Sequence, residues 1–275
     1  MPNQYKVVLV TGCSNGGIGF HICQQFARAG CRVYATSRRI ESMDGFRHPL
    51  IQILAMDVTS DEDVQGAVQK VIGAEGHVDI LVNNAGHSCI GPIAEIQMDR
   101  AMTTFDVNVF GALRTSKAVF PHMASRKSGL IINIGSFSGH IPSPWSGIYC
   151  ATKAALHSIT ENLQMECKPF NIDVMLVAPA SVKSNFSSNE SQVFALPEDS
   201  LYKGYLDLMI QRMWVSQGQD TMPTEKFANI VVNKALSKRP PTYLSLGGGA
   251  MLYTILKWLP RSLVLYLVWR KFSRK

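Results

Sequence analysis

The chain carries, at positions 11–19, the glycine-rich segment Thr11-Gly12-Cys13-Ser14-Asn15-Gly16-Gly17-Ile18-Gly19, which follows an apolar run at 7–10 and opens onto a stretch with helical periodicity. Glycines in such a turn let backbone N–H groups and the N-terminus of the helix approach a pyrophosphate without interference from Cβ atoms. A second β-rich run, at 32–36, follows about twenty positions later. Strand, glycine turn, helix and strand in this order predict a dinucleotide-binding unit; the alternative is a glycine turn without a ligand.

The rest of the 275-residue chain repeats this alternation of short β-rich runs with longer helical segments. The expected strands are 6–10, 32–36, 50–54, 79–82, 129–133, 173–177 and 242–246, and the expected helices are 18–29, 61–72, 100–124, 146–168 and 224–237. Alternation of this kind is typical of βαβ units. We therefore predict an α/β fold: a Rossmann-type doubly wound seven-stranded parallel sheet with helices on both faces, plus a C-terminal amphipathic tail.

Composition and charge divide the chain into a main body and a basic end. With 46% hydrophobic and 17% charged residues the chain is too apolar to be disordered, and its length suits one large core. Of the net charge of +7, all the excess lies after Glu225, the last acidic residue, which ten basic residues follow. These basic residues alternate with aliphatic and aromatic stretches, which favours contact with a membrane surface over nucleic acid.

The C-terminal tail, 249–275, follows an expected domain of residues 1–248. Its two apolar runs, 250–256 and 263–269, are separated by Lys257, Pro260 and Arg261. Each run is far shorter than the roughly twenty apolar residues that cross a bilayer. We expect an anchor in the membrane interface, held by aromatic and basic residues. The alternative is a C-terminal helix packed on a partner subunit or over the active site.

The cysteines and the N-terminus indicate an intracellular protein. The six cysteines form no C-x-x-C pair and no metal-ligand spacing with the seven histidines, so we expect reduced thiols and no metal site. Met1 to Tyr5 lead directly into the first apolar run, without the features of a secretory signal. The expected location is therefore intracellular.

The end of the second strand predicts which nicotinamide cofactor is bound. An NAD site needs an acidic residue there for the ribose 2′-hydroxyl, whereas an NADP site needs basic groups for a 2′-phosphate. The chain has Ser37-Arg38-Arg39 at this place, and no acidic residue before Glu41. Arginine pairs with phosphate oxygens through two parallel hydrogen bonds, so the sequence favours NADP. The alternative is that the arginines only solvate a loop.

A tyrosine and a lysine four residues apart indicate acid–base chemistry. Tyr149 and Lys153 lie one turn apart on the same face of an expected helix. A fixed cation stabilises a phenolate and brings proton exchange towards working pH, as proton transfer to an alcohol oxygen requires. Thirteen residues upstream, Ser136 follows the strand 129–133, at the sheet edge where α/β folds bind ligands.

From Lys6 to about Leu246 the chain resembles the short-chain dehydrogenase/reductase family. The resemblance is carried by the turn 11–19, Asp57-Val58, Asn83-Asn84-Ala85-Gly86, Asn108-Val109, Ser136, Tyr149 with Lys153, and Pro179 to Ser184. It implies an NADP-dependent oxidoreductase acting on CH–OH/C=O groups. It also implies that Tyr149 is the general acid, that Ser136 polarises the substrate carbonyl, and that Lys153 binds the nicotinamide ribose and lowers the tyrosine pKa. Asn108 would anchor a water in a proton relay to Lys153.

The predicted cofactor contacts combine the turn, the arginines and this resemblance. They are Gly12, Ser14, Gly17, Ile18, Gly19, Ser37, Arg38, Arg39, Asp57, Val58, Asn84, Ala85, Gly86, Tyr149, Lys153, Pro179, Val182 and Ser184. Asp57 would lie near the adenine amine. The turn is one residue longer than the family pattern, so either Gly16 or Gly17 takes the middle role. Ala180 replaces the family's glycine and narrows the backbone freedom there.

Within the family, the segments 84–89, 108–111 and 165–171 resemble the fungal 1-acyldihydroxyacetone-phosphate reductase group, which uses NADPH on a lipid-linked ketone at the endoplasmic reticulum and lipid droplets. Steroid and retinoid dehydrogenases share most of these features, so a hydroxysteroid, retinoid or secondary-metabolite ketone reductase is the alternative within the family. The resemblance implies a location at the membrane surface of the endoplasmic reticulum or lipid droplets, or otherwise in the cytoplasm. The apolar insertion 184–222 lies where the family builds its substrate lid, which suggests a lipophilic ketone; its methionines could instead serve the core or a dimer contact. Lys183, Lys203 and Arg212 are the candidate cations for a substrate phosphate.

Two further expectations concern assembly and activity. The family commonly forms homo-oligomers, dimers or tetramers, through the helices here expected at 100–124 and 146–168. Because a fold alone does not give function, a non-catalytic NADP-binding sensor or scaffold is the alternative from another class. That alternative predicts loss of the serine, tyrosine, lysine and asparagine set, and all four residues are present.

Overall fold

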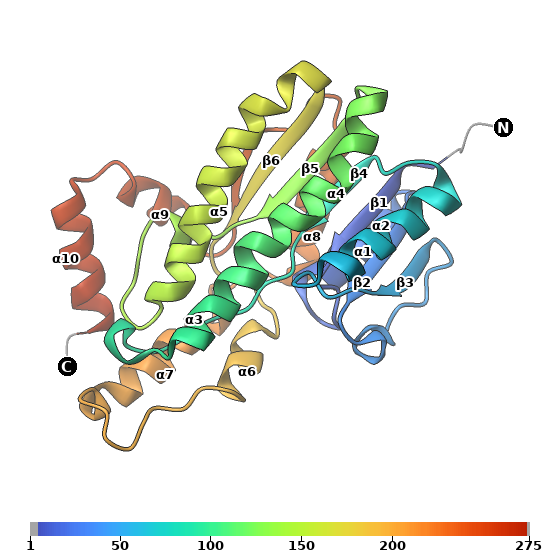
Figure 1. Cartoon of the computed structure of the whole chain (residues 1–275). Coiled ribbons are helices and arrows are strands. Elements are labelled where there is room, and N and C mark those ends of the chain that lie inside the picture. Colours follow the sequence, from blue (N-terminus) through green and yellow to red (C-terminus); the bar gives the residue numbers. More distant parts are fainter. Residues whose placement is uncertain (1–4, 274–275) are drawn as a thin grey trace.

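The computed structural model describes residues 5–273, and its centre is one sheet of seven parallel strands in the order β3-β2-β1-β4-β5-β6-β7 (Figure 1). The strands are β1 (Val7–Thr11), β2 (Arg32–Ser37), β3 (Ile51–Ala55), β4 (Ile80–Asn83), β5 (Gly129–Ile134), β6 (Ile172–Pro179) and β7 (Tyr243–Leu246). The predicted doubly wound parallel sheet is confirmed. The strand order reverses between β1 and β4, and such a switch point is where open α/β sheets bind ligands.

Helices cover both faces of the sheet because its side chains alternate between the two faces. The long helices are α1 (Ile18–Arg28), α2 (Asp61–Glu75), α4 (Gly111–Arg126), α5 (Gly147–Glu166) and α8 (Thr224–Ala235). Val8 and Val10 are buried in the core that contains residues of α1 and α8. Val7 and Leu9 point the other way, into the core formed with α2 and α4.

The segment expected as one helix at 100–124 has three parts. It begins with α3 (Met98–Phe105), continues through a π-helical turn at Asp106–Phe110, and ends as α4. A π-helical turn inserts one residue into a helix, so it leaves the hydrophobic pattern of the sequence almost unchanged. The prediction of a uniform α-helix was therefore wrong at this turn, which contains Asn108.

The remaining elements are short. They are α6 (Phe186–Ser191) and α7 (Leu206–Trp214) in the insertion, α9 (Ala250–Leu256) and α10 (Arg261–Phe272) at the C-terminus, and 3-10 turns at Ile40–Met43, Ile93–Glu95, Phe137–Gly139, Lys168–Phe170, Lys203–Tyr205 and Val215–Gln217. Figure 1 shows α6 and α7 at one end of the molecule and α10 beside them. Within residues 5–273, no helix combines the length and hydropathy needed to cross a bilayer.

The C-terminal helix packs against the main body. Val264, Val268 and Phe272 form a buried cluster with Ile141, which lies in the loop before α5. The indole N–H of Trp145 donates to the Phe272 carbonyl at 2.8 Å, and Arg261 donates to the His140 carbonyl at 2.9 Å. The helix α10 thus packs against the loop before α5. The rest of the tail, residues 274 and 275, lies outside the described residues.

Candidate active site

A cavity of about 900 Å³ lies at the carboxyl ends of β1, β2, β4, β5 and β6. The glycine turn and the β2 end form one part of its wall, and α5, the insertion and α10 form another. All the predicted catalytic and cofactor-binding residues line this cavity except Gly19 and Asn108. Residues that are distant in sequence therefore meet at the sheet edge where the strand order reverses.

The glycine turn brings the backbone of β1 close to the chain after β4. Gly12 has φ +71°, and a Cβ there would lie 2.7 Å from the Ala85 Cα, so a larger residue does not fit. Gly16 also has a positive φ, while Gly17 is the N-cap of α1 and lines the cavity. A Cβ on Gly19 would lie 2.5 Å from the Asn84 side-chain nitrogen, so Gly19 serves close packing behind the cavity wall.

Two exposed arginines at the end of β2 leave their charge free for a ligand. Arg38 and Arg39 both line the cavity, and neither forms a salt bridge with a carboxylate of residues 5–273. Ser14 and Ser37 lie beside them, each within hydrogen-bond distance of the Ser42 hydroxyl. Free guanidinium groups next to the open N-terminus of α1 fit a dinucleotide that carries an additional phosphate.

The other predicted cofactor contacts lie along the same wall, and several are fixed by local hydrogen bonds. Asp57 accepts from the backbone N–H and hydroxyl of Thr59, at 2.9 and 2.8 Å. The Asn84 amide donates to the carbonyls of Thr11 and Gly12, both at 2.9 Å. These bonds fix the wall before a cofactor binds. Val58, Ala85, Gly86, Pro179, Val182 and Ser184 complete this set.

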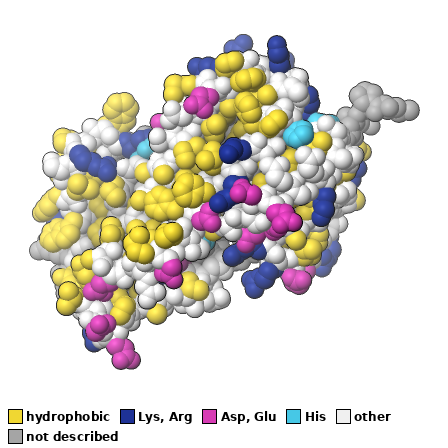
Figure 2. Space-filling view, viewed as in Figure 1, with side chains coloured by type: hydrophobic (Ala, Val, Ile, Leu, Met, Phe, Trp, Pro, Cys, Tyr) yellow, Lys and Arg dark blue, Asp and Glu magenta, His cyan; other side chains and the backbone are white. Residues whose placement is uncertain are grey.

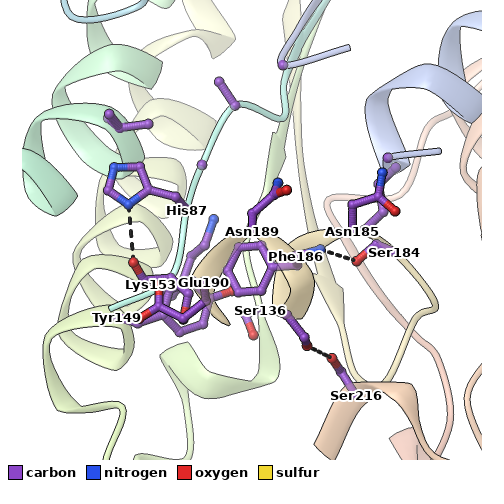
Figure 3. A pocket seen from close by; sticks show the side chains of 18 of the residues that line it. His87, Ser136, Tyr149, Lys153, Ser184, Asn185, Phe186, Asn189, Glu190 and Ser216 are labelled. Carbon is purple, nitrogen blue, oxygen red and sulfur yellow. Dashed lines mark hydrogen bonds between the residues drawn. The ribbon is translucent and has the colours of Figure 1, made fainter. Parts of the chain in front are cut away.

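Ser136, Tyr149 and Lys153 lie together in the cavity, as the spacing of the sequence predicts (Figure 3). The Ser136 side chain lies close enough to Tyr149 to lower the pKa of its phenol. Lys153 is 5% exposed, donates to the Ile134 carbonyl at 2.9 Å, and places its nitrogen 5.8 Å from the centre of the Tyr149 ring. Two hydroxyl groups and a buried amine therefore meet where a carbonyl oxygen can be bound and protonated.

Burial dominates the ionisation of this group. It raises the pKa of Tyr149 to about 12, although the Ser136 side chain and the charge of Arg212 act in the opposite direction. Burial also lowers the pKa of Lys153 to about 8. Loss of hydration thus outweighs the groups that lower this pKa, and the predicted effect of Lys153 on it stays a prediction. At neutral pH Tyr149 retains its proton, as a general acid requires.

Asn108 supports the site from behind the cavity wall. It is 1% exposed and lies in the π-helical turn. Its amide nitrogen donates to the His87 carbonyl and to the Thr152 hydroxyl, both at 3.0 Å, and its amide oxygen accepts from the His87 N–H at 2.9 Å. The Asn108 side chain thus ties the segment after β4 to α5. Its predicted part in a proton relay stays a prediction.

Sequence reasoning missed His157. This histidine is buried, and its Nε2 accepts a hydrogen bond from the Ser136 N–H at 3.2 Å. Side chains at Gly135 or Gly139 would overlap the His157 ring, so the backbone on either side of Ser136 packs closely against the imidazole. A signal was available, because His157 lies four residues after Lys153 and hence on the same helix face.

The insertion lines part of the cavity, and its predicted role as a substrate lid stays a prediction. The ring of Phe186, on α6, lies 5.3 Å from the ring of Tyr149, centre to centre. Glu190, also on α6, is buried; it accepts from the Ile90 N–H at 2.8 Å and pairs with Arg100 of α3. Met213 lines the cavity too, while Met209 is buried in a cluster with Ile90. The insertion therefore supplies both cavity wall and core.

Two other features of the substrate side could not be placed from sequence. Of Lys183, Lys203 and Arg212, only Arg212 lines the cavity. Val268 and Phe272 of α10 line it as well, so the C-terminal helix forms part of its wall. This matches one alternative for the tail, a helix packed over the active site.

Comparison with known proteins agrees with this geometry. Residues 6–193 match the family described as short chain dehydrogenase. The NADPH-dependent 1-acyldihydroxyacetone phosphate reductase of Schizosaccharomyces pombe is 33% identical over 229 residues, which cover 82% of this chain and 74% of that protein. The 3-ketodihydrosphingosine reductase of Bacteroides thetaiotaomicron is 30% identical over 269 residues, 96% of each chain.

A solved structure supports the same assignment. The crystal structure of a short-chain dehydrogenase from Streptomyces avermitilis has a TM-score of 0.81 and 31% identity, covering 99% of this chain and 98% of that one. The family match spans more than half of the chain and includes the glycine turn, Ser136, Tyr149 and Lys153. The chain belongs to the short-chain dehydrogenase family and is an oxidoreductase that acts on CH–OH or C=O groups.

Proposed function

We propose that the protein reduces a lipophilic ketone to a secondary alcohol with NADPH. The observation that carries this proposal is the meeting of Ser136, Tyr149 and Lys153 in one cavity whose wall also contains a group of apolar side chains. The apolar wall includes Ile90, Ile141, Phe186, Met213, Val215, Val268 and Phe272. Apolar side chains of this kind give the alkyl part of a lipid-like ligand a surface to pack against.

The proposed cofactor is held by the predicted contacts. The N-terminus of α1 and the turn that contains Gly12 and Gly17 would bind the pyrophosphate, and Arg38 with Arg39 would bind the 2′-phosphate. The S. pombe relative is named as NADPH-dependent, which supports this choice. When bound, NADPH supplies the hydride that reduces the carbonyl carbon.

The chain's own residues move the proton. Ser136 and Tyr149 both direct hydroxyl groups at the place of the carbonyl oxygen, and Tyr149 donates its proton as negative charge develops there. Lys153 holds positive charge behind Tyr149, stabilising the phenolate that the donation leaves. We propose that a water at Asn108 then returns a proton by way of Lys153.

The substrate class follows from the cavity walls and the relatives. Both curated relatives described above have names that denote reduction of lipid carbonyl compounds. A 1-acyldihydroxyacetone phosphate, or a similar lipid-linked ketone, combines an alkyl chain for the apolar wall with a carbonyl for Tyr149. This is the substrate class that we propose.

The outer faces of α9 and α10 fit a membrane surface. Trp258 is 87% exposed and Met251 80%, and Leu252, Ile255, Tyr266 and Trp269 are exposed as well. Figure 2 shows hydrophobic side chains on this side of the molecule. Lys257, Arg261, Arg270 and Lys271 supply positive charge nearby. We propose peripheral binding to an anionic surface such as that of the endoplasmic reticulum or a lipid droplet.

Vesicle flotation tests the membrane proposal. We expect the protein to float with vesicles that contain phosphatidylserine, and Met251→Ser combined with Trp258→Ser to reduce the bound fraction. Leu201→Ser is the control, because Leu201 is also exposed but lies in the insertion. Equal flotation of the double variant and the control would contradict the proposal.

We also propose a homo-oligomer that pairs through α4 and α5. Met102, Phe110 and Met165 are exposed along α3, the π-helical turn and α5. Sedimentation equilibrium tests this proposal: Phe110→Glu should shift the assembly towards monomer. If Phe110→Glu leaves the measured molar mass unchanged, the subunits do not pair through this surface.

A substrate screen with NADPH tests the proposed function. The panel contains acyldihydroxyacetone phosphates, steroids, retinals, polyketide-like ketones and small polar carbonyl compounds, and the readout is NADPH oxidation. We expect turnover of the lipophilic ketones. Turnover of only the small polar compounds would overturn the proposed substrate class, and no turnover of any carbonyl compound would favour the non-catalytic alternative.

A further inference from the structure

Arg212 is a cation in the cavity wall, and its hydrogen bond goes to Ser143 rather than to a residue of the catalytic set. It lies on α7, in the insertion, and lines the cavity. Its Nε donates to the Ser143 hydroxyl at 2.7 Å, and its guanidinium carbon lies 5.7 Å from the centre of the Phe272 ring. Three separate segments thus meet at this side chain: the loop before α5, the insertion and the C-terminal helix.

The charge of Arg212 is not balanced by the protein. Among the described residues, no carboxylate forms a salt bridge with it, and neither of its terminal nitrogens makes a hydrogen bond. Of the acids that line the cavity near the insertion, Glu190 pairs with Arg100, and Asp99 accepts from the backbone N–H of Arg100. A half-buried guanidinium with free N–H groups is poised for an anion.

Two observations connect Arg212 with the part of the cavity that holds the catalytic hydroxyls. Ser143 lies in the segment that connects Ser136 to Tyr149, so the Arg212–Ser143 hydrogen bond is close to the catalytic hydroxyls along the chain. The positive charge of Arg212 also acts on the Tyr149 phenol. Around Arg212 the wall is apolar, formed by Ile141, Val215, Val268 and Phe272.

We propose that Arg212, together with the Ser143 hydroxyl, binds an anionic group of the substrate, a phosphate or a carboxylate, within reach of the reacting carbonyl. This inference rests on the proposed function and narrows it: the substrate is an amphiphilic ketone with an anionic head. The free Nη atoms of Arg212 provide two parallel donors for the anion, and the apolar wall takes the alkyl chain.

Pairs of substrates that differ only in charge test this assignment. The first pair is a 1-acyldihydroxyacetone phosphate and the same compound without its phosphate; the second is a long-chain keto acid and its methyl ester. For each pair the readout is the ratio of kcat/KM for the anionic member to kcat/KM for the neutral member. The two pairs distinguish a phosphate site from a carboxylate site.

The wild-type enzyme should prefer the anionic member of at least one pair. Arg212→Met should lower that ratio roughly tenfold to a hundredfold, as expected for loss of a charge-assisted hydrogen bond in a partly buried site. Arg212→Lys keeps the charge and should restore much of the preference. Arg239→Met is the matched control, because Arg239 is exposed and lies outside the cavity wall, and it should leave the ratio unchanged.

A ratio insensitive to Arg212→Met would overturn the proposal, since a purely structural role would lower both kcat/KM values equally. A wild-type enzyme without preference for either anionic member would also overturn it. Both outcomes differ from failure of the proposed function, in which no ketone of either charge is reduced. NADPH binding to Arg212→Met, measured by fluorescence, confirms that the variant is folded.

Discussion

Acidification should destabilise the protein through two histidines that the fold keeps neutral. Burial lowers the pKa of His157 to about 3 and that of His140 to about 4, and the nearby Lys257 acts on both in the same direction. The two rings lie 4.5 Å apart, centre to centre, and Lys153 also disfavours the charged form of His157. Protonation therefore places charge next to charge in a buried site.

The sign and size of the effect follow from proton linkage. Both folded-state pKa values are below the ordinary value of 6.5, so below that pH the unfolded chain binds more protons than the folded one. Stability is complete above about pH 6.5 and is lost as the pH falls towards the folded-state values. At about pH 5.5, one unit below 6.5, each histidine lowers the free energy of unfolding by about 1.4 kcal/mol, and the two together lower it by about 3 kcal/mol. This figure depends little on the folded-state values because both lie well below pH 5.5.

Urea unfolding at about pH 7.5 and about pH 5.5 measures this loss. We expect the wild type to lose about 3 kcal/mol of unfolding free energy between the two conditions, and His157→Gln to lose about half of that. Glutamine can still accept from the Ser136 N–H but does not titrate. Equal losses for the wild type and the variant would refute the reasoning.

Three further predictions concern the cofactor, the catalytic amine and the lid. Arg38→Ala should weaken NADPH binding roughly tenfold to a hundredfold and leave NADH binding within a factor of about two, by fluorescence titration; equal weakening of both would contradict the 2′-phosphate contact. Because the pKa of Lys153 is lowered to about 8, its charge is lost as the pH rises through that value, so kcat/KM for reduction should fall above it; a flat profile there would exclude this role. Glu190→Gln leaves the half-buried charge of Arg100 without its partner, so limited proteolysis in 184–222 should accelerate severalfold relative to Glu198→Gln, an exposed control; equal cleavage would show that this ion pair does not hold the insertion in place.

Features carried by neighbouring residues could be predicted from the sequence. The glycine turn, the pair Arg38 and Arg39, and the spacing of Tyr149 and Lys153 all depend on backbone geometry over one or two turns. Strand alternation likewise predicted the seven-stranded sheet, with bounds that differ by only a few residues. The π-helical turn around Asn108 escaped prediction because one inserted residue hardly alters a hydrophobic pattern.

Features that depend on contacts between distant segments could not be predicted. The cavity role of Arg212 depends on Ser143 and Phe272, which lie 69 residues before it and 60 residues after it. In the tail, Val264 and Val268 are buried while Leu265 and Trp269 are exposed, so one apolar run supplies both a core face and an outer face. Hydropathy alone does not separate these two faces. The inner face of α10 matches the alternative of a helix over the active site, and the anchor on its outer face stays a proposal.

The most direct test of the proposed chemistry is the turnover of Tyr149→Phe beside its affinity for NADPH. The substitution removes the hydroxyl that donates the proton and keeps the ring that packs against Phe186. We predict that ketone reduction falls by at least about a hundredfold, the lower range for loss of a general acid, while the NADPH dissociation constant changes little. Turnover that stays near the wild-type rate would contradict the assignment of Tyr149 as the general acid.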